Sequence, residues 1–125
     1  MAEQAFKEDI EEQAAVFSAL ADPTRLRLVR LLCQQQEGRA LCVNALAALL
    51  GVTQSAISQH LKVLKAIGLV KGERRGYYIH YFINHEALER CREQALATLS
   101  LREPVGEKEY ENCCPLRGGR DVSGE

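Results

Sequence analysis

The chain has 125 residues, a formal net charge of −1 and an ordinary globular composition, with 46% hydrophobic and 26% charged residues. This length suits one domain around a single core. The acidic N-terminus and a longest apolar run of only ALAALLGV, residues 45–52, indicate neither a secretory signal nor a membrane span. We therefore expect a cytoplasmic protein without a membrane partner, whose five cysteines are free, ligating or redox-active rather than a disulfide framework.

Charge is divided unevenly along the chain. Residues 1–23 and the last forty residues are acidic, whereas residues 51–82 carry five basic side chains against Glu73 alone. A basic region between acidic ends indicates a face for a polyanion, because neutralisation of phosphates dominates nucleic-acid affinity.

Apolar spacing and capping residues predict five helices. Phe6, Ile10, Phe17 and Leu20 recur at helical spacing. Asp22-Pro23 supplies an N-cap and a first-turn proline for the second helix, and Thr53 can cap the fourth. The expected helices cover residues 6–20, 24–33, 42–51, 54–68 and 85–101.

Between residues 69 and 83 the apolar period changes to two. GYYIHYFI alternates, and the preceding LVKGERRG supplies a partner strand and a turn at Gly76, which predicts a β-hairpin. Beyond Pro104 the chain is polar and rich in glycine. We expect a domain over residues 1–102 and a flexible C-terminal tail over 103–125.

The third and fourth helices predict a helix-turn-helix at about 43–67, and the basic hairpin at about 69–83 makes it a winged helix in a mainly α fold. With Ile57, Leu61 and Leu64 facing inward, polar side chains of the fourth helix are free for base edges and phosphates. A winged helix used only for protein contacts is the alternative. The predicted DNA-binding residues are Gln54, Ser55, Ser58, Gln59, His60, Lys62, Arg74 and Arg75.

Three segments, FSALADPTRLRLVRLL, LAALLGVTQSAISQHLKVLKAIGLV and ERRGYYIHYFI, resemble the ArsR/SmtB family of metal- and metalloid-responsive repressors over about residues 14–100. The resemblance implies a homodimer joined through the first and last helices. Such a dimer binds double-stranded operator DNA without ligand and leaves it when an inducer binds. It implies no enzymatic activity and no cofactor.

Two inducer sites of the family are incomplete in this chain. The zinc-sensing positions of the last helix correspond to Asn84, Glu86, Ala97 and Ser100, which offer one plausible ligand where tetrahedral zinc needs four. The arsenite pattern Cys-Val-Cys-Asp-Leu-Cys corresponds to CVNALA at 42–47, which keeps only Cys42. We interpret Cys42 as a packing residue, and Cys33 and Cys91 as buried structural thiols.

The vicinal pair Cys113-Cys114 resembles a third family site, a metalloid site placed after the last helix. Adjacent Cα atoms lie about 3.8 Å apart and a relaxed disulfide needs about 4.4–6.8 Å, so the pair would bridge only under strain. Both sulfurs can instead bind one soft centre.

No third cysteine follows the pair in PLRGGRDVSGE. Trivalent arsenic forms three bonds, so arsenite would need another ligand, whereas methylarsenite needs only two thiols. The expected inducer is arsenite, methylarsenite or another organoarsenical, or antimonite, at Cys113 and Cys114. A third ligand, where one is used, stays open between solvent and Cys33, Cys42 or Cys91.

Two other interpretations stay open at this point. A thiol redox or persulfide sensor could use Cys33 or Cys42 as one half of a bridging pair. CPLRGGR at 114–120 matches Cys-x5-Arg, the phosphate loop of phosphatases and some arsenate reductases. That loop needs a following helix to cradle the oxyanion, and only DVSGE follows, so we do not expect an enzyme.

Overall fold

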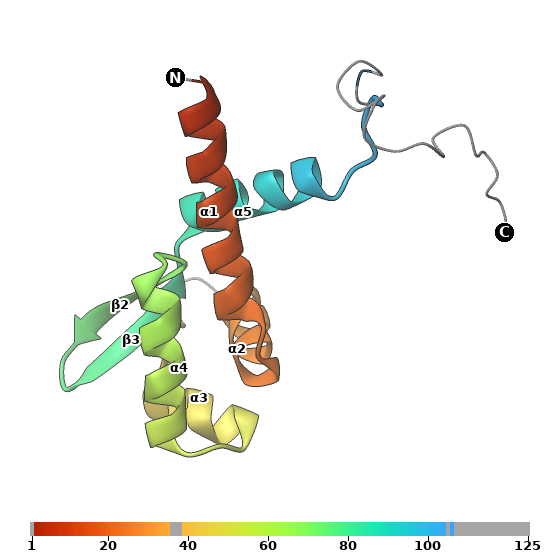
Figure 1. The fold of residues 1–125 in the computed structure, drawn as a ribbon. Coiled ribbons are helices and arrows are strands. Elements are labelled where there is room, and N and C mark those ends of the chain that lie inside the picture. Colours follow the sequence, from red (N-terminus) through yellow and green to blue (C-terminus); the bar gives the residue numbers. More distant parts are fainter. Residues whose placement is uncertain (1, 36–38, 105, 107–125) are drawn as a thin grey trace, which may run out of the picture.

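The computed structural model describes residues 2–35, 39–104 and 106, and their side chains from Asp9 onward. The fold is mainly helical with a small antiparallel sheet, as predicted (Figure 1). Within these residues the elements are, in order, α1 (Ala2–Leu20), α2 (Pro23–Gln34), β1 (Leu41–Cys42), α3 (Val43–Leu50), α4 (Gln54–Ala66), β2 (Val70–Arg75), β3 (Tyr78–Ile83) and α5 (His85–Thr98).

Side-chain caps set where three of the helices begin. Asp22 Oδ2 accepts a hydrogen bond from the backbone N–H of Arg25 at 3.1 Å at the start of α2. Thr53 Oγ1 accepts from Ala56 N at 3.0 Å before α4, and Asn84 caps α5 in the same way. The caps predicted at Asp22 and Thr53 are therefore confirmed.

The sheet has the order β1-β3-β2, with β3 in the centre. Val70 pairs with Ile83 and Arg75 with Tyr78 in the hairpin, which turns at Gly76 with a φ of 67°. The third strand, β1, pairs Cys42 with His80. The helix predicted from residue 42 begins at Val43 instead, and Cys42 belongs to β1. The prediction was wrong here because a strand of two residues is too short to show an alternating pattern.

The core lies where α2, α3 and α4 meet the sheet. The stripe predicted on α4 is confirmed, since Ile57, Leu61 and Leu64 are each exposed by 1% or less. Complete burial of such a side chain contributes about 1.5–3 kcal/mol to folding. The other large core residues are Leu28, Leu32, Leu46, Leu69, Val70, Tyr81 and Ile83.

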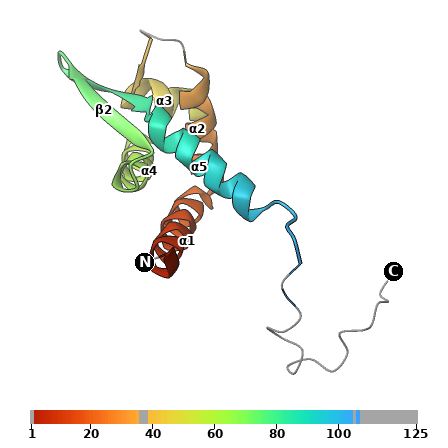
Figure 2. The same ribbon diagram turned by 90° about the horizontal axis from the view of Figure 1, so that it is seen from above.

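Helices α1 and α5 pack beside each other, outside this core. Seen from above, α5 extends away from the body formed by α2, α3 and α4 (Figure 2). No α5 side chain is fully buried against the described part of the chain, and Leu99, the C-cap residue of α5, is 77% exposed. We call the exposed apolar side chains of these two helices the terminal-helix face; they are Ile10, Phe17, Leu96 and Leu99.

None of the helices in the described ranges is both long enough and apolar enough to cross a membrane.

Candidate nucleic-acid interface

The outer face of α4 is polar along its N-terminal half. Gln54, Ser55, Ser58, Gln59 and Lys62 are all exposed, as the sequence predicted. They project outward because the opposite stripe of the helix is fixed in the core, so a helix of 3.6 residues per turn leaves these positions to solvent. Amide and hydroxyl groups on a protruding helix can hydrogen-bond base edges.

His60 lies at the edge of this face and points toward α2. Its side chain is half-buried, and Nδ1 lies 3.9 Å from Asp22 Oδ2. The backbone N–H of Arg25 is the main cause that holds the pKa of Asp22 below its usual value, and the charges of His60 and Arg25 act in the same direction. His60 therefore connects α4 to the start of α2.

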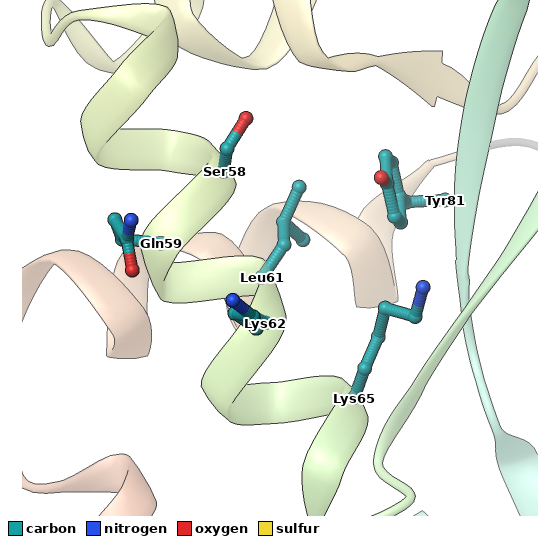
Figure 3. A pocket seen from close by; sticks show the side chains of 6 residues that line it. All are labelled: Ser58, Gln59, Leu61, Lys62, Lys65 and Tyr81. Atoms are coloured by element: carbon teal, nitrogen blue, oxygen red, sulfur yellow. The ribbon is translucent and has the colours of Figure 1, made fainter.

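A groove of about 330 Å³ separates α4 from the hairpin. In Figure 3 the ring of Tyr81, on β3, faces α4, and the side chains of Leu61 and Lys65 reach toward it. Gln59 and Lys62 point away from the ring (Figure 3). The groove thus has polar and cationic walls and an aromatic side.

The ring of Tyr81 packs closely over Gly72 on the neighbouring strand. A Cβ atom at Gly72 would lie 3.0 Å from Tyr81 Cε1 and 3.0 Å from Ile79 Cγ2. Gly72 therefore provides the space that lets Tyr81 lie flat along the sheet.

Lys65 is an exposed residue of the groove that the sequence analysis missed. The spacing of Lys65, three residues after Lys62, places both on the same side of a helix and could have indicated it. Tyr81 belongs to the core, where it is 8% exposed, and its position at the groove depends on how the hairpin packs against α4.

The two wing arginines differ in their surroundings. Arg74 is exposed, and its Nη1 donates to the carbonyl of Gly76 at 3.4 Å. Arg75 Nη2 donates to Glu73 Oε1 at 3.1 Å, and its guanidinium carbon lies 4.9 Å from the centre of the Phe82 ring. Successive residues of a strand face opposite sides, so the two arginines lie on different faces of β2.

A side-chain bridge joins the end of α2 to the base of the hairpin. Gln35 Nε2 donates to the carbonyl oxygen of Tyr81 at 2.8 Å, and Gln35 Oε1 accepts from Leu41 N at 3.1 Å. Leu41 and Tyr81 are partners in the β1–β3 ladder. Gln35 thus fixes the short strand β1 against β3 and connects the hairpin to α2.

Three cysteines are described, and they are not all buried. Cys33 is exposed, which corrects the predicted burial: it directly follows the buried Leu32 and so falls on the outer side of α2. Cys42 and Cys91 are half-buried. Partial burial raises the pKa of the Cys33 and Cys91 thiols, which disfavours the reactive thiolate.

The described ranges contain no group of three His, Cys, Asp or Glu side chains placed to hold a metal ion. Among the positions compared with the zinc site, Asn84 caps α5 and Glu86 is exposed on its first turn. Cys113, Cys114 and the CPLRGGR segment lie outside the described residues.

Known proteins are similar to this chain in sequence and in fold. The model of the family described as "Bacterial regulatory protein, arsR family" matches residues 22–71. The arsenical resistance operon repressor of Bacillus subtilis is 33% identical over 98 residues, which cover 78% of this chain and 86% of that protein.

A second relative, the transcriptional repressor SmtB homolog of Synechocystis, is 44% identical over 77 residues. The match covers 60% of this chain, and the chain spans only 55% of that relative's length. The fold is similar to the homodimeric winged helix-turn-helix DNA-binding domain from Mycobacterium bovis, with a TM-score of 0.58 at 28% identity, covering 78% of this chain and 88% of that one.

Proposed function

Because the chain belongs to the ArsR family of bacterial regulatory proteins, we propose that it is a transcriptional repressor that binds double-stranded operator DNA as a homodimer. The observation that carries this proposal is the exposed polar face of α4 beside a groove with cationic walls. Residues 1–102 form the DNA-binding and dimerisation domain, and residues 103–125 form a C-terminal segment that carries the inducer site.

In this proposal α4 enters the major groove with its N-terminal half. The side chains of Gln54, Ser55, Ser58 and Gln59 read base edges, and Lys62 contacts phosphate. His60 supports α4 from its edge through Asp22.

In this proposal the arginines of the wing contact phosphates of the DNA backbone beside the major groove. Arg74 is free to do so, since its one described hydrogen bond goes to a turn carbonyl. Arg75 must first exchange its contact with Glu73, an exposed ion pair of a kind worth only about 0.2–1 kcal/mol. Lys65 adds a further cation at the groove.

The terminal-helix face supports the homodimer. Leu96 on α5 and Leu99 at its C-cap are 63% and 77% exposed, and Ile10 and Phe17 are exposed on α1. Large apolar side chains that stay exposed on two helices in contact with each other are consistent with an interaction site. A second copy of the chain would cover it with an identical surface, as a two-fold interface requires.

Trivalent arsenicals are the proposed inducers, bound by Cys113 and Cys114. Each thiol would replace one hydroxyl group on arsenic and release one water, so methylarsenite would use both thiols and keep its methyl group. Arsenite and antimonite would keep a third ligand, from solvent or from Cys33, Cys42 or Cys91. The name of the Bacillus subtilis relative, an arsenical resistance operon repressor, supports this class of inducer.

Operator binding and inducer binding are then linked. If methylarsenite lowers operator affinity by some factor, operator DNA must lower methylarsenite affinity by the same factor.

An operator titration of the full-length protein tests the inducer assignment. Fluorescence anisotropy of labelled operator DNA would be followed with methylarsenite, arsenite, antimonite and Zn²⁺ in parallel. We expect release by the trivalent arsenicals and no release in Cys113→Ser or Cys114→Ser. Cys91→Ser is the matched control for methylarsenite, which needs only two thiols, and should respond to it like the wild type. An unchanged response in Cys113→Ser would overturn the site assignment.

A redox or persulfide response is a second candidate function, favoured by the exposure of Cys33. Persulfide treatment followed by intact-mass measurement would reveal a cysteine bridge. A bridge that is lost in Cys33→Ser and that lowers operator affinity would support this candidate instead of the arsenical response.

A further inference from the structure

A second groove lies along α2, away from the α4 groove. Two adjoining hollows of about 340 and 220 Å³ share Leu31 and Gln34 in their walls. Their apolar surface also includes Leu41 from β1 and Leu50 from α3. We call this surface the α2 groove. It has no lining residue in common with the groove between α4 and the hairpin.

The rim of the α2 groove is basic. Arg27 and Arg30 line one hollow and Arg39 lines the other, and all three are exposed. None of them forms an ion pair with another residue in the described ranges. An apolar floor with an unpaired cationic rim fits an acidic segment that also carries apolar side chains.

The chain itself contains such a segment directly after its last helix. Residues 103–112, EPVGEKEYEN, have four glutamates against one lysine, with Val105 and Tyr110 between them. Ten residues span up to about 35 Å when extended, which matches the diameter of a domain of this size. Because the segment is tethered, its effective concentration at the groove is millimolar, so that even weak binding would keep the groove occupied.

We propose that the distal part of this acidic segment, residues 107–112, docks in the α2 groove, with its glutamates against Arg27 and Arg30. The groove includes Gln35, whose amide is hydrogen-bonded to the Tyr81 carbonyl at the base of the hairpin. The docked segment therefore lies next to the bridge that connects α2 to the wing. This inference does not depend on the identity of the inducer.

Hydrogen exchange measured by mass spectrometry on the full-length protein tests the docking. The amides of segment 107–112 should exchange about three- to tenfold more slowly in the wild type than in Arg27→Glu/Arg30→Glu. Glu107→Arg/Glu109→Arg should accelerate exchange by a similar factor, and the combination of all four changes should restore the slow rate. Arg92→Glu, an exposed arginine on α5, is the matched control and should leave the rate unchanged.

Three results would overturn the proposal. Equal exchange in the wild type and in Arg27→Glu/Arg30→Glu would mean that the segment does not dock. Acceleration by Arg92→Glu of about half that size, in proportion to its smaller change of charge, would mean that only overall charge matters. Loss of operator affinity in Arg27→Glu/Arg30→Glu, with unchanged exchange of the segment, would make the α2 groove a DNA contact instead.

Discussion

Helices α4 and α5 have almost the same length, 13 and 14 residues, but the chain packs them very differently. Three α4 side chains are completely enclosed by α2, α3 and the sheet. On α5 and at its C-cap, Leu96 and Leu99 remain exposed. The difference shows that α4 is held in place by its own chain, whereas α5 has an apolar surface that one chain does not cover.

The largest expected effect is on the stability of the fold, through the buried side of α4. Leu61→Ala removes a fully buried side chain and should lower the free energy of unfolding by about 2–5 kcal/mol. Val63→Ala, on the exposed side of the same helix, should cost less than about 1 kcal/mol. Urea denaturation followed by circular dichroism measures both. Equal losses for the two variants would contradict the packing described for α4.

The second prediction concerns the terminal-helix face, which a single chain leaves exposed to solvent. Leu96→Glu/Leu99→Glu should raise the dimer dissociation constant by about a hundredfold or more, since charges would replace apolar side chains in the interface. Analytical ultracentrifugation measures this, and the helical content should remain. A dimer of unchanged stability would place the interface elsewhere.

A smaller effect should distinguish the two wing arginines. The logarithm of operator affinity falls linearly with the logarithm of salt concentration, with a slope that changes by about 0.9 for each phosphate contact. Arg74→Ala should reduce the slope by this amount in each half of the dimer. Arg75→Ala should reduce it less, because its guanidinium is already bonded to Glu73. Equal reductions would show that Glu73 releases Arg75 in the complex.

The smallest effect is a pH dependence at the junction of α2 and α4. Asp22 has a lowered pKa in the folded protein, so its carboxylate stabilises the fold above its unfolded pKa, and this contribution is lost as the pH falls through the folded value. Asp22→Asn keeps a capping oxygen but removes the charge. The stability advantage of the wild type over this variant should therefore shrink below about pH 4, as urea titrations at several pH values can measure. A gap that stays constant down to pH 2 would show that the charge contributes nothing.

Much of the fold could be predicted from sequence because local signals and burial agree. Asp22 and Thr53 mark helix starts that the structure confirms. The stripe of Ile57, Leu61 and Leu64 also determines which polar residues of α4 face outward. In such a segment one periodicity sets both the core and the interface.

The features that could not be predicted depend on contacts between distant residues. Strand β1 forms because it pairs with β3 and because Gln35 accepts a hydrogen bond from Leu41. The hydrophobic pattern around residues 41–42 indicates neither contact. Part of the difference between Arg74 and Arg75 is of this kind, because the ring below the Arg75 guanidinium belongs to Phe82 on the opposite strand. The exposure of Cys33 follows from which side of α2 meets the core.

The central claim is that a dimer of this chain reads DNA through α4. Selection of binding sites from a random pool of double-stranded DNA by the full-length protein tests it most directly. We expect enrichment of a two-fold symmetric site whose half-sites are centred about one helical turn, roughly 34 Å, apart. Enrichment of no sequence, or of a single site without symmetry, would contradict the claim.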